Sequence, residues 1–74
     1  MKITIKLFAV LKRGRFKEKC FEYNDGMTVG EVVQSLRLPP EHVDIMLVNG
    51  QHVTIDRMLV DGDVLSILPM VDGG

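Results

Sequence analysis

The end of the chain holds the residues best suited to chemistry. The sequence finishes in Gly73-Gly74, so two residues without a Cβ carry the α-carboxylate. Glycine adopts backbone angles closed to other residues, and two glycines form a thread thin enough for a narrow tunnel. An α-carboxylate is ionised at neutral pH and is a nucleophile toward an activated phosphate. We therefore predict that Gly74 is the reacting residue and that Gly73 belongs to the flexible tail that presents it.

The other residue types that could do chemistry are isolated. Cys20 lies in a predicted strand without a base near it in the sequence, and one cysteine gives no disulfide framework. His42 and His52 are lone histidines, which do not make a metal shell. The two carboxylates at 61–63 flank a glycine, which a turn explains better than a cation site. We expect no metal, no bound cofactor, and no catalysis by this chain alone.

The size of the chain supports that expectation. With 74 residues and 8.3 kDa, it has room for one domain and not for a separate cofactor domain. A hydrophobic content of 46% indicates a folded core. The longest apolar stretches, 8–11 and 45–48, are far shorter than the roughly 20 residues of a membrane span. We predict a single domain over residues 1–74, in the cytoplasm, with no membrane partner.

The strands are predicted from alternation and turn residues. Ile3, Ile5 and Leu7 alternate with polar residues, as in a strand with one buried face. A polar turn at 12–15 and renewed alternation over 20–23 predict an antiparallel hairpin. Further strands are predicted over 45–48, 51–53 and 64–68, the first two joined by Asn49-Gly50, a dipeptide that tolerates positive φ in a tight turn.

One helix is predicted between these strands. Thr28 and Glu31 form a capping box, an apolar stripe at helical spacing follows, and the prolines at 39–40 forbid continuation, which allows nearly three turns. A single stripe predicts an α+β domain in which the helix packs on one face of a mixed sheet of four to five strands. The predicted core is Ile3, Ile5, Leu7, Phe21, Val29, Val32, Val33, Leu36, Leu47, Leu59, Leu65 and Ile67.

Charge is distributed unevenly along the chain. Residues 1–20 carry a net charge of +6 and the remainder −7, which gives −1 overall. The basic hairpin includes Lys12, Arg13 and Arg15, and it lacks the interleaved aromatic residues of a nucleic-acid stacking platform. We expect a solvated loop or a steering patch for an acidic partner protein, and no nucleic acid.

Several short motifs, in this order and spacing, resemble one family, the MoaD/ThiS sulfur-carrier proteins. They are Phe8-Ala9-Val10-Leu11, Thr28-Val29-Gly30-Glu31-Val32-Val33, Val48-Asn49-Gly50, Leu59 with Asp61-Gly62-Asp63-Val64, and Pro69 before Gly73-Gly74. The resemblance implies the ubiquitin-like β-grasp fold. It also implies that an E1-like enzyme uses ATP to adenylate the Gly74 carboxylate, that a donor such as a cysteine desulfurase or rhodanese supplies sulfur, and that the resulting thiocarboxylate delivers it inside a partner enzyme.

Within that family, the Phe-Ala-x-Leu element and Pro69 favour the small subunit of molybdopterin synthase, whose partner is the large subunit. Met70 stands where that branch often has a second proline, and Asp72 where it usually has a small uncharged residue. Val48-Asn49-Gly50 fits the thiamin branch equally well, so a carrier for thiazole synthase is the alternative. A protein-modifier tag and a plain β-grasp binding module remain open.

The docking surface is predicted from strand alternation. Phe8 and Leu68 should point away from the helix, and Met70 should lie beside them where the tail departs. An apolar patch would then adjoin the reactive end, and such patches mark interaction sites. We predict that Phe8, Leu68 and Met70 contact the partner proteins.

Overall fold

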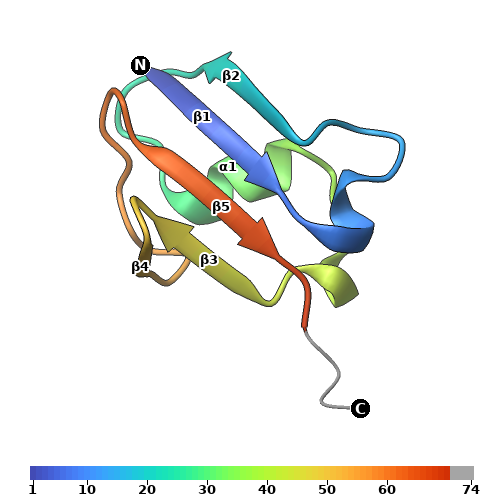
Figure 1. Cartoon of the computed structure of the whole chain (residues 1–74). Helices are drawn as coiled ribbons and strands as arrows, with labels where there is room; N and C mark the ends of the chain where they lie inside the picture. Colours follow the sequence, from blue (N-terminus) through green and yellow to red (C-terminus); the bar gives the residue numbers. More distant parts are fainter. Residues whose placement is uncertain (71–74) are drawn as a thin grey trace.

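The computed structural model describes residues 1–70, and in it five strands form one mixed sheet with one α-helix on one face (Figure 1). The strand order is β2-β1-β5-β3-β4; β1 and β5 are parallel, and the other neighbours are antiparallel. The elements in chain order are β1 (Lys2–Leu7), the 3₁₀ helix η1 (Ala9–Lys12), β2 (Glu18–Glu22), α1 (Val29–Ser35), the 3₁₀ helix η2 (Pro40–His42), β3 (Ile45–Val48), β4 (Gln51–His52) and β5 (Val64–Leu68). The predicted α+β architecture is confirmed.

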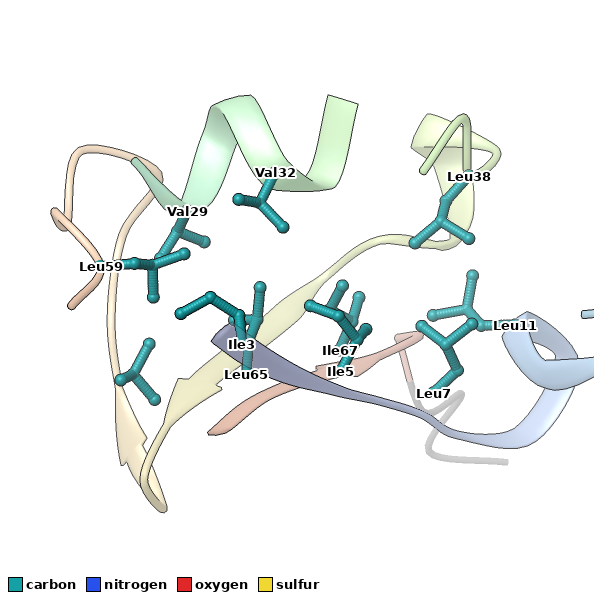
Figure 2. Close-up of a cluster of buried hydrophobic side chains, with 11 residues drawn as sticks. Ile3, Ile5, Leu7, Leu11, Val29, Val32, Leu38, Leu59, Leu65 and Ile67 are labelled. Atoms are coloured by element: carbon teal, nitrogen blue, oxygen red, sulfur yellow. The ribbon is translucent and has the colours of Figure 1, made fainter. Parts of the chain in front are cut away.

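The hydrophobic core lies between α1 and the neighbouring strands β1 and β5 (Figure 2). Alternate residues of β1 and β5 are completely or almost completely buried, as the period of two predicts. The buried hydrophobic residues are Ile3, Ile5, Leu7, Leu11, Val29, Val32, Leu38, Val48, Leu59, Leu65 and Ile67. Of the predicted core, Phe21, Val33 and Leu36 are only partly buried and pack against this cluster.

The prediction for Leu47 is wrong. Leu47 pairs with Ser66, whereas Val48 pairs with Leu65 and is 1% exposed. Adjacent residues of a strand point to opposite faces, so Val48 enters the core and Leu47 lies on the face away from α1, called here the open face. The four apolar residues of β3 show no alternation, and for this reason the sequence could not indicate which of them faces the core.

Helix α1 begins as predicted and ends early. The hydroxyl of Thr28 accepts from the Glu31 amide at 3.2 Å, and the Glu31 carboxylate accepts from the Thr28 amide at 3.0 Å, which completes the capping box. The helix has seven residues, about two turns, instead of nearly three. Arg37 adopts a left-handed φ of 54°. This reversal returns the chain to the sheet and buries Leu38, before the prolines are reached.

Gly30 explains why the first turn of α1 contains a glycine. Its amide donates to the carbonyl of Ile55 at 2.9 Å, and a Cβ at this position would lie 3.0 Å from the Ile55 Cβ. The loop at 54–58 therefore packs directly on the helix backbone, and a side chain at Gly30 would push the two apart.

The Asn49-Gly50 turn is confirmed, with φ values of 51° and 83°. The Asn49 side chain also joins this turn to β5: its amide donates to Asp63 Oδ1 at 3.0 Å, and its oxygen accepts from the Val64 amide at 3.0 Å. Asp63 is 4% exposed, and its other oxygen accepts from the Val60 amide at 2.9 Å. These bonds satisfy the buried carboxylate and hold the loop before β5 against the sheet.

Truncating the central core residues tests this arrangement. Ile5→Ala and Leu65→Ala each leave a cavity between α1 and the sheet, which costs about 2 to 5 kcal/mol. A domain of this size has about 3 to 5 kcal/mol in total, so both variants should be largely unfolded by circular dichroism. Val60→Ala, at a residue 59% exposed, is the matched control and should melt like the parent. Cooperative, near-parent melting of both core variants would contradict the arrangement.

Candidate functional site

The candidate site lies at the end of the sheet formed by the C-terminal ends of β1 and β5. These strands are parallel, and their register runs from Thr4 beside Val64 to Leu7 beside Ile67. One further step along each strand places Phe8 beside Leu68. Figure 1 shows that β5 stops at this end of the sheet and that the described chain leaves the sheet there. The parallel pairing therefore brings the end of the first strand to the base of the C-terminal segment.

The backbone after Phe8 explains the exposure of that residue. Phe8 is in an extended conformation and continues the alternation of β1, so its ring lies on the open face and is 39% exposed. Ala9 then takes a left-handed φ of 53°, and η1 turns the chain back so that Leu11 is fully buried. The Phe8-to-Leu11 motif thus has three parts: an outward ring, a small residue at a strained angle, and an apolar anchor.

Two further apolar residues lie on the same face. Ile45 is opposite Leu68 in the antiparallel pair of β3 and β5, and Leu47 is opposite Ser66. Together, Phe8, Ile45, Leu47 and Leu68 make up what is called here the apolar patch. Met70, two residues after Leu68, is 65% exposed. Ile45 and Leu47 were missed as site residues because the uniformly apolar strand conceals its outer face.

Charged residues border the patch beside Phe8. A hollow of about 280 Å³ is lined by Lys6, Leu7, Phe8, Lys17 and Glu18. Lys6 and Glu18 form an ion pair of 3.9 Å across β1 and β2. An apolar centre with a charged rim is the usual anatomy of a protein–protein contact.

The predicted site residues differ in what the structure says of them. Phe8 directly follows β1, Leu68 is the last residue of the neighbouring strand β5, and Met70 follows on the segment that leaves β5. Gly73 and Gly74, together with the rest of 71–74, lie outside the described residues. The roles of all five residues remain predictions.

The remaining candidates do not form a site. His42 is exposed on η2, His52 is exposed on β4, and Cys20 is exposed on β2. The turn at 61–63 is structural, since Asp61 accepts from the Lys2 amide at 2.6 Å. Within residues 1–70, no three His, Cys, Asp or Glu side chains are grouped so that they could hold a metal. In the same part of the chain, no helix is long and apolar enough to cross a bilayer.

Comparison with known protein families identifies the family of this chain. The model described as the ThiS family matches residues 5–74, nearly the whole chain. The chain belongs to the ThiS family.

Solved structures support that assignment and the β-grasp fold. A Pyrococcus furiosus protein assigned to subunit 1 of molybdopterin converting factor is 26% identical over 96% of this chain and 99% of its own, with a TM-score of 0.79. A chain from the Helicobacter pylori complex of molybdopterin-converting factor subunits 1 and 2 is 25% identical over the whole of both chains, with a TM-score of 0.68. SAMP1 of Haloferax volcanii, 23% identical over both whole chains with a TM-score of 0.80, shares the fold.

This ThiS-family chain offers a local test of the segment that exposes Phe8. A non-glycine residue at positive φ costs about 1 to 3 kcal/mol, and more where the side chain is β-branched. Ala9→Val should therefore lower the free energy of unfolding by at least about 1 kcal/mol, whereas Ala9→Gly should stay within about 1 kcal/mol of the parent. Urea unfolding of the two variants measures both values. Equal stability of Ala9→Val and Ala9→Gly would show that Ala9 is not held at this angle.

Proposed function

We propose that this protein is a sulfur carrier for molybdopterin biosynthesis: the carboxylate of Gly74 is adenylated, converted to a thiocarboxylate, and used as the sulfur source. The observation that carries the proposal is the ThiS-family match, which extends through residue 74. The two similar structures that belong to molybdopterin converting factor favour this pathway. The chain would act as a carrier, and catalysis would belong to its partners.

The chemistry requires two substitutions, the first at the α-phosphorus of ATP and the second at the acyl carbon of Gly74. A carboxylate oxygen of Gly74 attacks the α-phosphate of ATP, and pyrophosphate leaves. The terminal sulfur of a persulfide on a cysteine desulfurase or a rhodanese then attacks the acyl carbon, and AMP leaves with the oxygen, which gives an acyl disulfide. A second thiol attacks the donor-side sulfur of this disulfide, is oxidised with it to a new disulfide, and so supplies the two electrons that release the acyl-bound sulfur. The product is a thiocarboxylate. An E1-like enzyme would bind the ATP, so this chain needs no nucleotide site of its own.

The geometry of the apolar patch suits such a carrier. Gly74 is the fourth residue after Met70, and an extended chain spans at most about 3.5 Å per residue. The reacting carboxylate therefore lies within about 14 Å of Met70, beside the patch to which a partner would bind. The partner's active site must lie close to its docking surface, and the reaction gains from reduced freedom of the tail.

The second subunit of the Helicobacter pylori complex indicates the kind of partner. We propose that a molybdopterin synthase large subunit receives the tail of this chain. Thiazole synthase, the recipient in the alternative assignment, would use the same thiocarboxylate. Sulfur transfer from the purified thiocarboxylate to a molybdopterin precursor, compared with transfer in a thiazole-forming assay, distinguishes the two pathways.

Removal of the aromatic ring tests the apolar patch. Phe8→Ala should weaken binding to the activating enzyme or to the synthase large subunit more than tenfold, about 1.4 kcal/mol or more. The fold should be retained, because the Phe8 ring is outside the buried core. Titration calorimetry gives the affinity, and Val60→Ala, another exposed apolar residue far along the sequence, should bind like the parent. An unchanged affinity for Phe8→Ala would place the interface elsewhere, most directly at Lys12, Arg13 and Arg15.

Changes in the tail test the reaction itself. Deleting Gly74 shortens the chain by about 3.5 Å, and Gly73→Val adds a branched side chain where a tunnel would admit only hydrogen. Each change should abolish thiocarboxylate formation with activating enzyme, ATP and a sulfur donor. Intact-mass analysis detects the product as one oxygen exchanged for sulfur.

The control is the melting temperature. The buried hydrophobic core described above ends at Ile67, so both tail variants should melt like the parent. Normal adenylation of the chain that lacks Gly74 would refute the carrier and leave a β-grasp binding module. Conjugates linked through lysine, without thiocarboxylate, would identify a protein modifier instead.

A further inference from the structure

Strand β2 is one of the two edge strands of the sheet, with β4 at the other border. It pairs only with β1, and the ladder bonds include Leu7 amide to Lys17 carbonyl and Tyr23 amide to Met1 carbonyl. Hydrogen bonds of an antiparallel pair alternate along each strand. The odd-numbered residues of β2 therefore face β1, and the amides and carbonyls of Glu18, Cys20 and Glu22 point outward. In residues 1–70, no hydrogen bond of these outward groups is found.

A groove runs beside this edge, between β2 and α1. It has a volume of about 430 Å³, and its lining includes Phe16, Phe21, Leu36 and Leu38. The Phe16 and Phe21 rings are 5.3 Å apart, so they form a continuous apolar wall. Figure 1 shows β2 at the border of the sheet and α1 behind the sheet. A strand added to β2 would send alternate side chains into this groove.

The two faces of β2 have opposite charge. On the helix face, Lys19 lies over the Phe21 ring at 5.3 Å, and both Arg15 and Lys19 line the groove. On the open face, Glu18 and Glu22 are exposed and flank Cys20. An added strand therefore meets a basic and apolar surface on one side. On the other side it meets two exposed glutamates, of which Glu18 is paired with Lys6 at 3.9 Å and Glu22 is opposite Lys2 in the sheet.

We propose that the β2 edge binds an extended segment of a partner protein as a sixth strand. The segment alternates: acidic and large apolar side chains face the groove, and lysine or arginine side chains face Glu18 and Glu22. Main-chain hydrogen bonds to Glu18, Cys20 and Glu22 supply part of the affinity, and the alternating side chains supply the specificity, as in other cases of strand addition.

A second copy of this chain fits the edge poorly. When two β2 strands pair antiparallel about Cys20, Glu18 of each copy lies opposite Glu22 of the other, and like charges directly opposite are unfavourable. A nucleic acid also fits poorly, because its phosphates would approach the same two glutamates. The charge pattern thus favours a partner strand of mixed charge.

This edge can be separated experimentally from the proposed carrier reaction. The groove is on the helix face of the sheet, whereas the apolar patch is on the open face, and neither Phe8 nor Leu68 lines the groove. The two surfaces approach each other only at Glu18, which also lines the hollow beside Phe8. Deleting Gly74 should leave binding at β2 unchanged. Failure of the sulfur chemistry would therefore not affect this proposal, and failure of strand addition would not affect the carrier.

A peptide with the required alternation is the probe. We use the capped peptide Asp-Lys-Ile-Lys-Leu-Lys-Glu-Lys-Asp and a control of the same composition, Ile-Leu-Asp-Glu-Lys-Lys-Asp-Lys-Lys. With ¹⁵N-labelled protein, the alternating peptide should shift the amide signals of Glu18, Cys20 and Glu22 and slow their hydrogen exchange. The control peptide should bind at least about tenfold more weakly, a difference of about 1.4 kcal/mol.

Variants of β2 test the contacts separately. Cys20→Pro removes one outward amide and leaves the hydrogen bonds between β2 and β1 intact. Proline is tolerated at such a position because β2 is an edge strand. The variant should weaken binding at least about tenfold. Cys20→Ala is its control and should bind like the parent. Lys19→Glu should also weaken binding about tenfold, whereas Lys12→Glu, outside the groove lining, should change it little. Circular dichroism tests whether each variant is folded. If Cys20→Pro does not fold, the comparison of Lys19→Glu with Lys12→Glu decides whether the partner binds at β2.

Four results would overturn the proposal. They are equal binding of the two peptides, equal binding by Lys19→Glu and the parent, a concentration-dependent dimer that protects the β2 amides without peptide, and single-stranded RNA that shifts the same amides more strongly than the alternating peptide does.

Discussion

The parallel pairing of β1 with β5 is the constraint on which the rest of the structure depends. It joins the first and last strands of the chain at the centre of the sheet, and the buried residues of both strands build most of the floor beneath α1. Because parallel strands end at the same edge, the pairing also places Phe8 next to Leu68. One set of backbone hydrogen bonds therefore determines the core and the surface from which the C-terminal segment departs.

In the described part of the chain, the single short α-helix leaves one face of the sheet uncovered. One seven-residue helix covers one face of a five-stranded sheet, so the other face has no layer on it within residues 1–70. The open face tolerates this because most of its positions on β1 and β2 are polar or charged, with Lys6 paired to Glu18. Apart from Val64 at the start of β5, the apolar residues of this face gather where β1 and β5 end and along the antiparallel strand β3. Such local concentration on an otherwise polar face is the pattern of an interaction site rather than of a second core.

The sequence predicted the elements where local chemistry is decisive. Alternation located β1 and β5, the capping box located the start of α1, and Asn49-Gly50 located the turn between β3 and β4, because each depends on residues close in sequence. It failed where distant residues decide. Leu47 was assigned to the wrong face because only the register with β5 orients β3, and α1 is shorter than predicted because Arg37 turns the chain so that Leu38 can reach the core. The outward position of Phe8 could be predicted from alternation, whereas that of Ile45, opposite Leu68, could not.

The fold also separates two surfaces that a small carrier would otherwise have to combine. The apolar patch lies on the open face across β1, β5 and β3, at the edge where β5 ends, while the β2 groove lies on the helix face at the border of the sheet. A partner strand on β2 would extend the sheet sideways and would leave Phe8 and Leu68 uncovered. The basic loop between β1 and β2 contributes Arg15 and Phe16 to the groove, which gives its positive charge a specific place in the structure. The basic first part of the chain thus supplies Arg15 and Lys19 to the β2 groove, whereas the apolar patch lies beside the departing C-terminal segment, so that a strand bound at β2 and a partner bound at the patch would use different faces of the sheet.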